Sequence, residues 1–343
     1  MKKLLFLSIF AVLTAISWVA CSKEDTTTTA KSITTEAKVQ VIDGTLHFEN
    51  DIHFYTELER LKKMSADDFK TWEANLGFKS QGSLAEEVQE KLGAANSKEE
   101  YEQIIARNSD IIELKNELPM VKNHFRSLER VLDRNGNVYV NSVLYNYSNG
   151  GEIIIKSGDK LLLKNISFDM KTDEDRGILL FPIDKDNSRT ACGVSNGGEF
   201  TNAAQDRRAV LSAFTNRVFT LNPIPSTTGE NLYFVKCFTS IKGTPYKKNI
   251  FGNWKTYSTA NNLTSIFGVA TFDLNFQQFV TAPNFSNAYT NNWDGISDGG
   301  THLEKQNVPQ SQLSGMDIRF SYMGSVKYGH QGTNGNFITL ICQ

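Results

Sequence analysis

The feature that most constrains the fold is a change in hydrophobic period at Gly136. Before it, apolar residues recur at helical spacing, and after it they follow the two-residue period of β-strands. Charged residues are concentrated on the helical side, whereas Asn, Thr, Ser, Phe and Tyr are frequent on the strand side. No alternation of strands with helices follows, which disfavours a parallel α/β sheet. We therefore predict an α+β protein, helical first and antiparallel β afterwards.

Short connections indicate how the strands after Gly136 pair. The first four runs lie at 137–140, 143–147, 152–156 and 161–163. Turns of a few residues between them can only join antiparallel neighbours, so we predict a β-meander. Later runs lie at 177–181, 209–214, 232–238, 266–272, 317–322 and 337–341. Their long Asn/Gly/Ser connections favour a sandwich-like β body over 136–343, with residue 200 as a candidate sub-boundary.

The helical N-terminal region is expected to span 37–135. It opens with a hairpin over 39–48, in which Asp43-Gly44 is typical of a type I′ turn. After a first amphipathic helix, Ser65 is predicted to cap a second helix, which Gly77 ends.

Two further helices are predicted from capping boxes. Ser83 and Ser97 are each followed by a glutamate three residues later, which is the signature of a helix start. The stretch 110–132 is expected to continue in helical character, broken at Pro119.

The N-terminus is predicted to be a secretory signal peptide, residues 1–20, because two lysines precede an apolar run and a small residue. The run is shorter than a membrane-spanning helix and ends in a polar tail. Ordinary signal-peptidase cleavage is disfavoured by bulky Trp18 at position −3. Val19-Ala20-Cys21 instead resembles a bacterial lipobox, which implies lipidation of Cys21. The acidic, threonine-rich stretch 21–36 would then be a solvated tether.

Charge and cysteine content exclude several classes. The formal net charge is −2, and no basic face stands out for nucleic acid. Neither zinc-like cysteine spacing nor a phosphate-cradling loop occurs, so we predict no metal and no cofactor. If Cys21 is lipidated, Cys192, Cys237 and Cys342 remain, which leaves open one disulfide or none.

Three segments carry a family resemblance: Trp72-Glu73-Ala74-Asn75-Leu76-Gly77-Phe78-Lys79-Ser80, Gly136-Asn137-Val138-Tyr139-Val140 and Ile250-Phe251-Gly252-Asn253-Trp254. With the leader, they resemble an uncharacterised family of surface-exposed lipoproteins of Bacteroidota, a domain of unknown function, over most of the chain. The resemblance implies a lipid anchor in the outer membrane, with the body facing the cell exterior. It implies sugar binding only by association with glycan-uptake genes.

Aromatic residues in polar loops are the candidate ligand contacts. Trp254 and Tyr257 lie in one such segment, Tyr289 and Trp293 in another. Exposed rings of this kind stack on sugars, and neighbouring asparagines supply amide hydrogen bonds, although tryptophans of β domains are more often core residues. Trp293 has the most polar surroundings and is the preferred candidate.

Two enzyme-like motifs are weak by comparison. Gly193-Val194-Ser195-Asn196-Gly197 matches a nucleophile elbow, but that motif requires a strand-to-helix turn of a parallel sheet. The loop 291–300 offers oxygen ligands, but Ile296 interrupts the calcium pattern. We therefore predict non-catalytic binding of a glycan or an envelope protein. A secreted glycosidase or esterase, and a structural adhesion or assembly component, are the alternatives.

Overall fold

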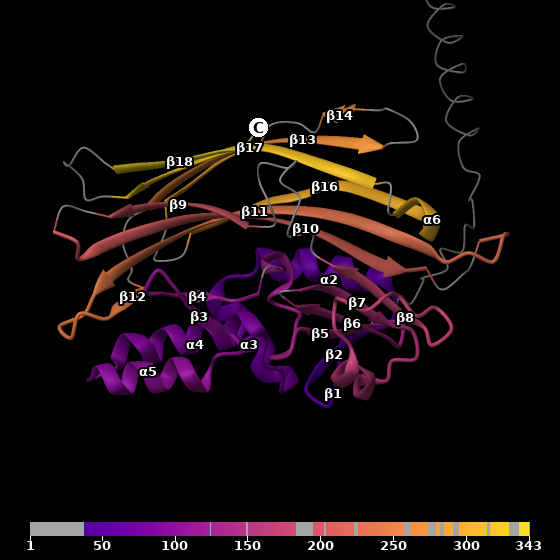
Figure 1. Ribbon diagram of the computed structural model, residues 1–343, viewed down its shortest axis with the longest axis horizontal. Helices are drawn as coiled ribbons and strands as arrows, with labels where there is room; N and C mark the ends of the chain where they lie inside the picture. The colour runs from indigo at the N-terminus through magenta and orange to yellow at the C-terminus, as the bar shows by residue number, and fades with distance from the viewer. Residues whose placement is uncertain are drawn as a thin grey trace, which may run out of the picture. The chain divides into compact units, whose positions relative to one another are not determined.

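The protein is described by a computed structural model, coloured along the chain in Figure 1. The described residues are 38–123, 125–148, 150–182, 195–201, 204–222, 226–256, 261–273, 279–281, 285–290, 295–313, 316–328 and 336–342. Residues 38–343 form one compact unit. Helices and antiparallel sheets are both present, so the α+β class is confirmed. Within the described ranges, none of the helices has the length and apolarity needed to span a bilayer.

The first sheet combines the N-terminal hairpin with the meander. Its order is β1 (Gln40–Ile42), β2 (Thr45–Phe48), β5 (Asn137–Val140), β6 (Val143–Ser148), β7 (Gly151–Ile155) and β8 (Ile178–Pro182). The pairing of β2 with β5 is parallel, and the others are antiparallel. The boundary predicted at residue 135 therefore does not separate the hairpin from the meander.

Two-residue turns shape this sheet as the sequence predicts. Asp43 and Gly44 have φ values of 49° and 73°, and Asn141 and Ser142 have 52° and 62°. Positive φ at both central residues is the type I′ geometry, whose twist matches that of the flanking strands.

Four helices follow β2, visible in indigo and purple in Figure 1: α2 (Asp51–Lys63), α3 (Ala66–Leu76), α4 (Gln81–Ala94) and α5 (Lys98–Arg107). Ser65 caps α3 by accepting from the Asp68 backbone N–H, and Gly77 ends it in the left-handed region. Ser97 accepts from the Glu100 N–H at the start of α5. These three predictions are confirmed.

The predicted start of α4 at Ser83 is wrong. The helix begins three residues earlier, with Ser80 as its N-cap. Glu73, a buried side chain of α3, accepts from the Ser80 N–H and from the Ser83 hydroxyl. A contact from the preceding helix therefore moves the boundary.

Two other predicted elements are corrected. The stretch 110–132 is not helical over its length, because 112–121 form a hairpin of β3 (Ile112–Lys115) and β4 (Leu118–Val121). Asn116 and Glu117 both have positive φ and make the turn. The run 161–163 is no strand but lies in a 3₁₀ helix, Lys160–Asn165, whose start is capped by Asp159.

The later strands form two antiparallel sheets. The second sheet contains β9 (Ser195–Thr201), β10 (Arg207–Leu221), β11 (Leu232–Lys248), β12 (Trp254–Thr256) and β16 (Gly295–Pro309). The third contains β13 (Asn261–Asp273), β14 (Phe279–Thr281), β15 (Phe285–Thr290), β17 (Met316–Tyr328) and β18 (Asn336–Cys342). The predicted runs from residue 209 onward are all present as strands longer than the predicted run, whereas the run 177–181 forms β8 of the first sheet.

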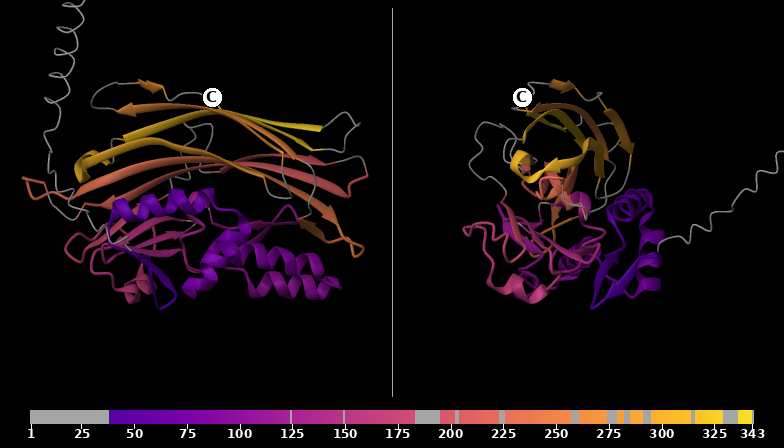
Figure 2. Two further views of the ribbon diagram at one scale, coloured as in Figure 1. Left: turned by 180° about the vertical axis from the view of Figure 1, so that it is seen from behind. Right: turned by 90° about the vertical axis from the view of Figure 1, so that its right-hand side faces the viewer.

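One large core joins the first sheet, α2 and the second sheet. Phe54 and Leu58 of α2 pack there with Tyr145 of β6 and Tyr233 and Val235 of β11. Figure 2 shows the helices and the first sheet on one side of the long strands of the second sheet. Burial of these apolar side chains, about 1.5–3 kcal/mol each, is the main stabilising contribution.

Candidate functional site

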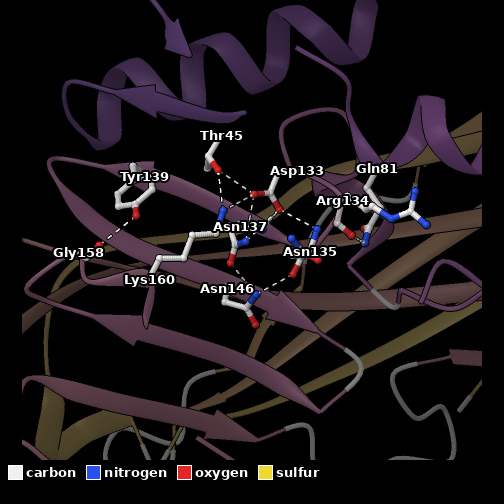
Figure 3. Close-up of polar contacts among 10 residues, drawn as sticks. All are labelled: Thr45, Gln81, Asp133, Arg134, Asn135, Asn137, Tyr139, Asn146, Gly158 and Lys160. Atoms are coloured by element: carbon white, nitrogen blue, oxygen red, sulfur yellow. Dashed lines mark hydrogen bonds and ion pairs between the residues drawn. The ribbon is translucent and has the colours of Figure 1, made fainter. Parts of the chain in front are cut away.

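A buried polar cluster surrounds Asp133, drawn in Figure 3. We call Thr45, Asp133, Asn137, Asn146 and Lys160 the Asp133 cluster. The first four are buried, whereas the Lys160 side chain is 37% exposed. The residues come from β2, the 133–137 turn, β5, β6 and the 3₁₀ helix, so the cluster ties together segments far apart in the chain.

Six hydrogen bonds end on the Asp133 carboxylate. Its Oδ1 accepts from the backbone N–H of Asn135 at 2.8 Å, from that of Asn137 at 2.9 Å and from the Asn137 amide at 3.1 Å. Its Oδ2 accepts from the Thr45 hydroxyl at 2.7 Å, from the Lys160 ammonium at 3.0 Å and from the Asn137 amide at 3.0 Å. A second tier follows, because the Asn146 amide donates to Asn137 Oδ1 at 2.8 Å.

The local sequence explains why the turn folds around this carboxylate. The Gly136 N–H donates to the Asp133 carbonyl, and the Asp133 N–H donates to the Asn137 carbonyl. Gly136 has φ 80°, and a Cβ there would collide with the Tyr147 carbonyl oxygen, so only glycine fits. With both oxygens saturated by donors, Asp133 has no lone pair to offer a substrate proton. Its role in the described structure is to hold the turn.

His47 lies beside this cluster. Its ring stacks on Tyr139, with centroids 4.1 Å apart and an interplanar angle of 14°. The Tyr139 hydroxyl donates to the Gly158 carbonyl at 3.0 Å. Burial lowers the pKa of His47 below its usual 6.5; Lys160 lowers it further and Asp43 partly opposes this. Nε2 of His47 is buried without a hydrogen-bond partner among the described residues. Burial and the Lys160 charge therefore favour the neutral form of His47.

We expect His47 to make stability fall on acidification. The unfolded chain takes up a proton near pH 6.5 and the folded chain only at lower pH, so the free energy of unfolding decreases as pH drops through that window. His47→Phe keeps an aromatic ring on Tyr139 and removes the titration. Urea unfolding of both proteins from about pH 7.5 to about pH 5 measures this around the ordinary histidine pKa. A stability difference between them that is independent of pH would contradict the assignment.

A second buried carboxylate, Glu152 of β7, joins the first and second sheets. Its exposure is 1%, and its Oε2 accepts from the backbone N–H of Phe219 at 3.1 Å. The Leu221 N–H donates to the Tyr145 hydroxyl at 2.9 Å. The pairing of β9 with β10 ends at Ser195 and Phe214, so the later part of β10 needs other acceptors. Two side chains of the first sheet supply them.

The surroundings of Glu152 keep the nearby phenols neutral. Burial, and next the Glu152 charge, raise the pKa of Tyr147. The pKa of Tyr145 is raised by burial and by Glu152, although its bond to Leu221 opposes this. Both tyrosines are therefore neutral core residues, and the Tyr145 hydroxyl accepts from the Leu221 N–H.

Trp254, a predicted sugar contact, is buried with 2% exposure. Its Nε1–H donates to Glu117 Oε2 at 3.3 Å, and its carbonyl accepts from the Tyr101 hydroxyl at 2.8 Å. The Arg208 guanidinium lies 4.6 Å and the Lys248 ammonium 5.0 Å from its ring centroid. No ring face of Trp254 is left for a stacked sugar. It is a structural residue that joins α5 and the β3–β4 turn to the second sheet.

The exposed apolar residues of the same segment are Ile250 and Phe251, with exposures of 92% and 45%. They lie in the turn between β11 and β12, which we call the β11–β12 tip, residues 249–253. From the sequence, Trp254 and Tyr257 are the predicted ligand contacts of this segment. The Asn249-Ile250-Phe251-Gly252-Asn253 pattern, a glycine turn between asparagines, was the signal available for an exposed tip.

The other predicted site residues are only partly placed. Cys21, Tyr257 and Trp293 lie outside the described residues. Tyr289 lies in β15, where its backbone faces Leu263 of β13. The predictions for these residues stay predictions.

The alternative motifs and the cysteines are placed as follows. Ser195 begins β9, an antiparallel strand, and faces Phe214 of β10 rather than opening a helix. Residues 291–294 and Cys192 lie outside the described residues, while residues 295–300 of the predicted loop belong to β16 instead. Cys237 and Cys342 lie in β11 and β18. Among the residues that the structure describes, no three His, Cys, Asp or Glu side chains are grouped so as to hold a metal ion.

Comparisons with known proteins add little to this geometry. No family model matches the chain, and no curated protein matches it. Among solved structures, it is similar to a DUF4848 family protein from Bacteroides thetaiotaomicron, with 15% identity and a TM-score of 0.31 over 89% of this chain and 100% of that one. A likeness this distant carries neither a fold nor a function over to this chain.

Proposed function

We propose that the chain is exported, lipidated on Cys21 and displayed on the outer face of the outer membrane. The leader 1–20 and the lipobox-like ending before Cys21 support the anchor. The compact unit begins at Lys38, directly after the polar stretch 21–36 that we interpret as a tether. A folded body on such a tether can reach ligands beyond the membrane surface.

Replacing Cys21 with serine tests the anchor. Because the serine cannot carry the thioether-linked lipid, we expect Cys21→Ser to shift the protein from the membrane pellet to the soluble fraction after a high-salt wash. Globomycin-type inhibition of lipoprotein processing in the wild-type strain is the matched control and should leave an unprocessed precursor. Retention of Cys21→Ser in the washed membranes would contradict lipid anchoring.

We further propose that the displayed body binds a glycan or an envelope protein without catalysing a reaction. The supporting observation concerns the three buried carboxylates among the described residues, all of which hold the fold together. Glu73, Asp133 and Glu152 each accept from the protein's own backbone N–H groups. Carboxylates bonded in this way make the backbone around them rigid, and a rigid backbone favours a preformed binding surface.

A sandwich-like packing of the second and third sheets is part of this proposal. Contacts of β13 with β16 and of β9 with β18 support it. Loops at the ends of such a body, including the segment with Tyr289 and Trp293, would carry the ligand site.

A glycan-array screen of the chain from residue 22 onward tests the ligand class. We expect binding to a restricted set of glycans, lost in Trp293→Ala and kept in Trp254→Phe, because Trp293 is the preferred candidate for stacking on a sugar whereas the Trp254 ring is buried. If no plant, host or microbial glycan bound, a glycan would be excluded as the ligand and an envelope protein would remain as the proposed ligand. Turnover of any glycan, measured as released reducing ends, would overturn the non-catalytic assignment.

A further inference from the structure

We propose that the β11–β12 tip is a membrane-contacting element that inserts Ile250 and Phe251 into the interface of an anionic lipid bilayer. The inference concerns a surface separate from the predicted aromatic ligand site. It does not depend on the lipid on Cys21.

The tip is preorganised by one asparagine side chain. Asn249 Oδ1 accepts from the backbone N–H of Phe251 at 2.9 Å and from that of Asn253 at 3.0 Å. The Asn249 N–H donates to the Asn253 carbonyl at 2.9 Å, and the Gly252 N–H donates to the Asn249 carbonyl at 3.0 Å. Gly252 takes φ 80°, which closes the turn. Ordering the tip therefore costs little on binding, and the two apolar side chains are held outward.

The tip holds the most exposed large apolar side chain among the described residues. Ile250 is 92% exposed and Phe251, its neighbour, 45%. The turn that joins β11 to β12 projects from the body in both Figure 1 and Figure 2. Transfer of an isoleucine and a phenylalanine from water to an apolar phase is favourable by about 1.5–3 kcal/mol each when burial is complete.

The hairpin around the tip is cationic. From residue 231 to residue 272 the sequence contains no Asp or Glu, and Lys247 and Lys248 directly precede the tip. Of the other lysines, Lys236 is buried and the Lys255 ammonium donates to the Gly93 carbonyl at 2.8 Å. Lys248 is exposed, one residue before the tip. The nearest carboxylate-bearing residues come from other elements: the Asp206 carbonyl accepts from the Lys248 N–H, and Glu117 accepts from Trp254. Exposed apolar side chains preceded by lysines complement the surface of an anionic bilayer, in which phosphate headgroups lie above acyl chains.

The size of the tip favours a bilayer over a protein partner. A stable protein interface buries about 800 Å² on each side, with a packed apolar centre. Two side chains on a projecting turn supply far less, but a bilayer interface accepts a small convex apolar element because lipids rearrange around it. Each lysine near an anionic surface adds about 1 kcal/mol. We therefore assign the tip to a lipid surface.

Vesicle co-sedimentation tests this assignment. The protein is the chain from residue 22 onward, which keeps the compact unit 38–343 and lacks the leader and Cys21. We expect it to bind phosphatidylcholine vesicles that contain phosphatidylglycerol, to bind pure phosphatidylcholine vesicles more weakly, and to dissociate as salt is raised.

Paired variants separate the apolar and the cationic contributions. Ile250→Ser with Phe251→Ser should lower partitioning about tenfold or more, since tenfold corresponds to only 1.4 kcal/mol. Lys248→Gln should reduce the preference for phosphatidylglycerol. Ile52→Ser is the matched control, because Ile52 is 75% exposed on α2 and away from the tip. It should bind as the parent does. Unchanged urea midpoints would show that all variants are folded.

Three outcomes would overturn the proposal. They are no binding to the anionic vesicles, equal binding by the tip variant and the parent, and loss of binding in the Ile52→Ser control alone. Self-association that the tip variant abolishes, seen by analytical ultracentrifugation without vesicle binding, would assign the tip to a second copy instead. Because Cys21 is absent throughout, these outcomes are independent of the lipid-anchor test and of the glycan screen.

Discussion

Asp133→Ala is expected to lower the free energy of unfolding by about 3–5 kcal/mol, because each buried donor that loses its acceptor costs about 1–3 kcal/mol. The carboxylate accepts six hydrogen bonds, and its loss leaves the buried Asn137 N–H, the Asn137 amide and the Thr45 hydroxyl without acceptors. Equilibrium urea unfolding followed by circular dichroism measures the change. Since the turn joins the helical segment to β5, we expect one cooperative transition at lower urea.

Lys160→Met is the matched comparison. The Lys160 side chain is 37% exposed, so its ion pair with Asp133 is partly screened by water, and five other donated bonds still hold the carboxylate. We expect a cost of about 1 kcal/mol or less. If Lys160→Met destabilised as much as Asp133→Ala, the ion pair rather than the turn would be the stabilising element.

Trp254→Ala is expected to cost about 3–5 kcal/mol, as large-to-small changes of buried aromatic residues do. The indole packs with Leu118, Val210 and Tyr246 and lies under Arg208 and Lys248. The loss removes apolar burial and the cation–π contacts together. Urea unfolding monitored by the remaining tryptophans would report it as a lower midpoint.

Glu117→Gln provides the comparison for Trp254. Glu117 is exposed, and its bond to the indole is long at 3.3 Å, so the neutral amide should change stability by no more than about 0.5 kcal/mol. A small effect of Trp254→Ala beside a large effect of Glu117→Gln would show that the hydrogen bond, and not burial, accounts for this contact.

Elements specified by neighbouring residues could be predicted from the sequence. The type I′ turn at Asp43-Gly44, the cap at Ser65, the stop at Gly77 and the cap at Ser97 all depend on atoms within a few positions of one another. Such interactions form whatever the rest of the chain does, so their patterns can be recognised locally.

Elements settled by distant contacts were predicted wrongly. The helix expected over 110–132 contains the β3–β4 hairpin, whose Pro119 carbonyl accepts from Gln89 and from Tyr246. The start of α4 moved because Glu73 accepts from Ser80. In both cases a partner from another element competes with the local preference, and a periodicity window cannot contain it.

The candidate site shows the same division. The sequence predicted ligand contacts at Trp254 and Tyr257, but in the structure Trp254 is buried and the neighbouring Phe251 is exposed. The backbone N–H of Phe219 donates to Glu152, 67 positions earlier in the chain. No local sequence pattern predicts such a contact.

The α+β class, most of the late strands and the tight turns follow from local sequence, because hydrophobic period and backbone φ preference are properties of short stretches. The sequence also carries the prediction of a lipid anchor at Cys21, which rests on the leader alone. Tertiary structure decided which polar groups are saturated and which apolar side chains stay in water. Those properties depend on what segments remote in the chain place around a residue, as the buried Asp133 cluster and the exposed β11–β12 tip both illustrate.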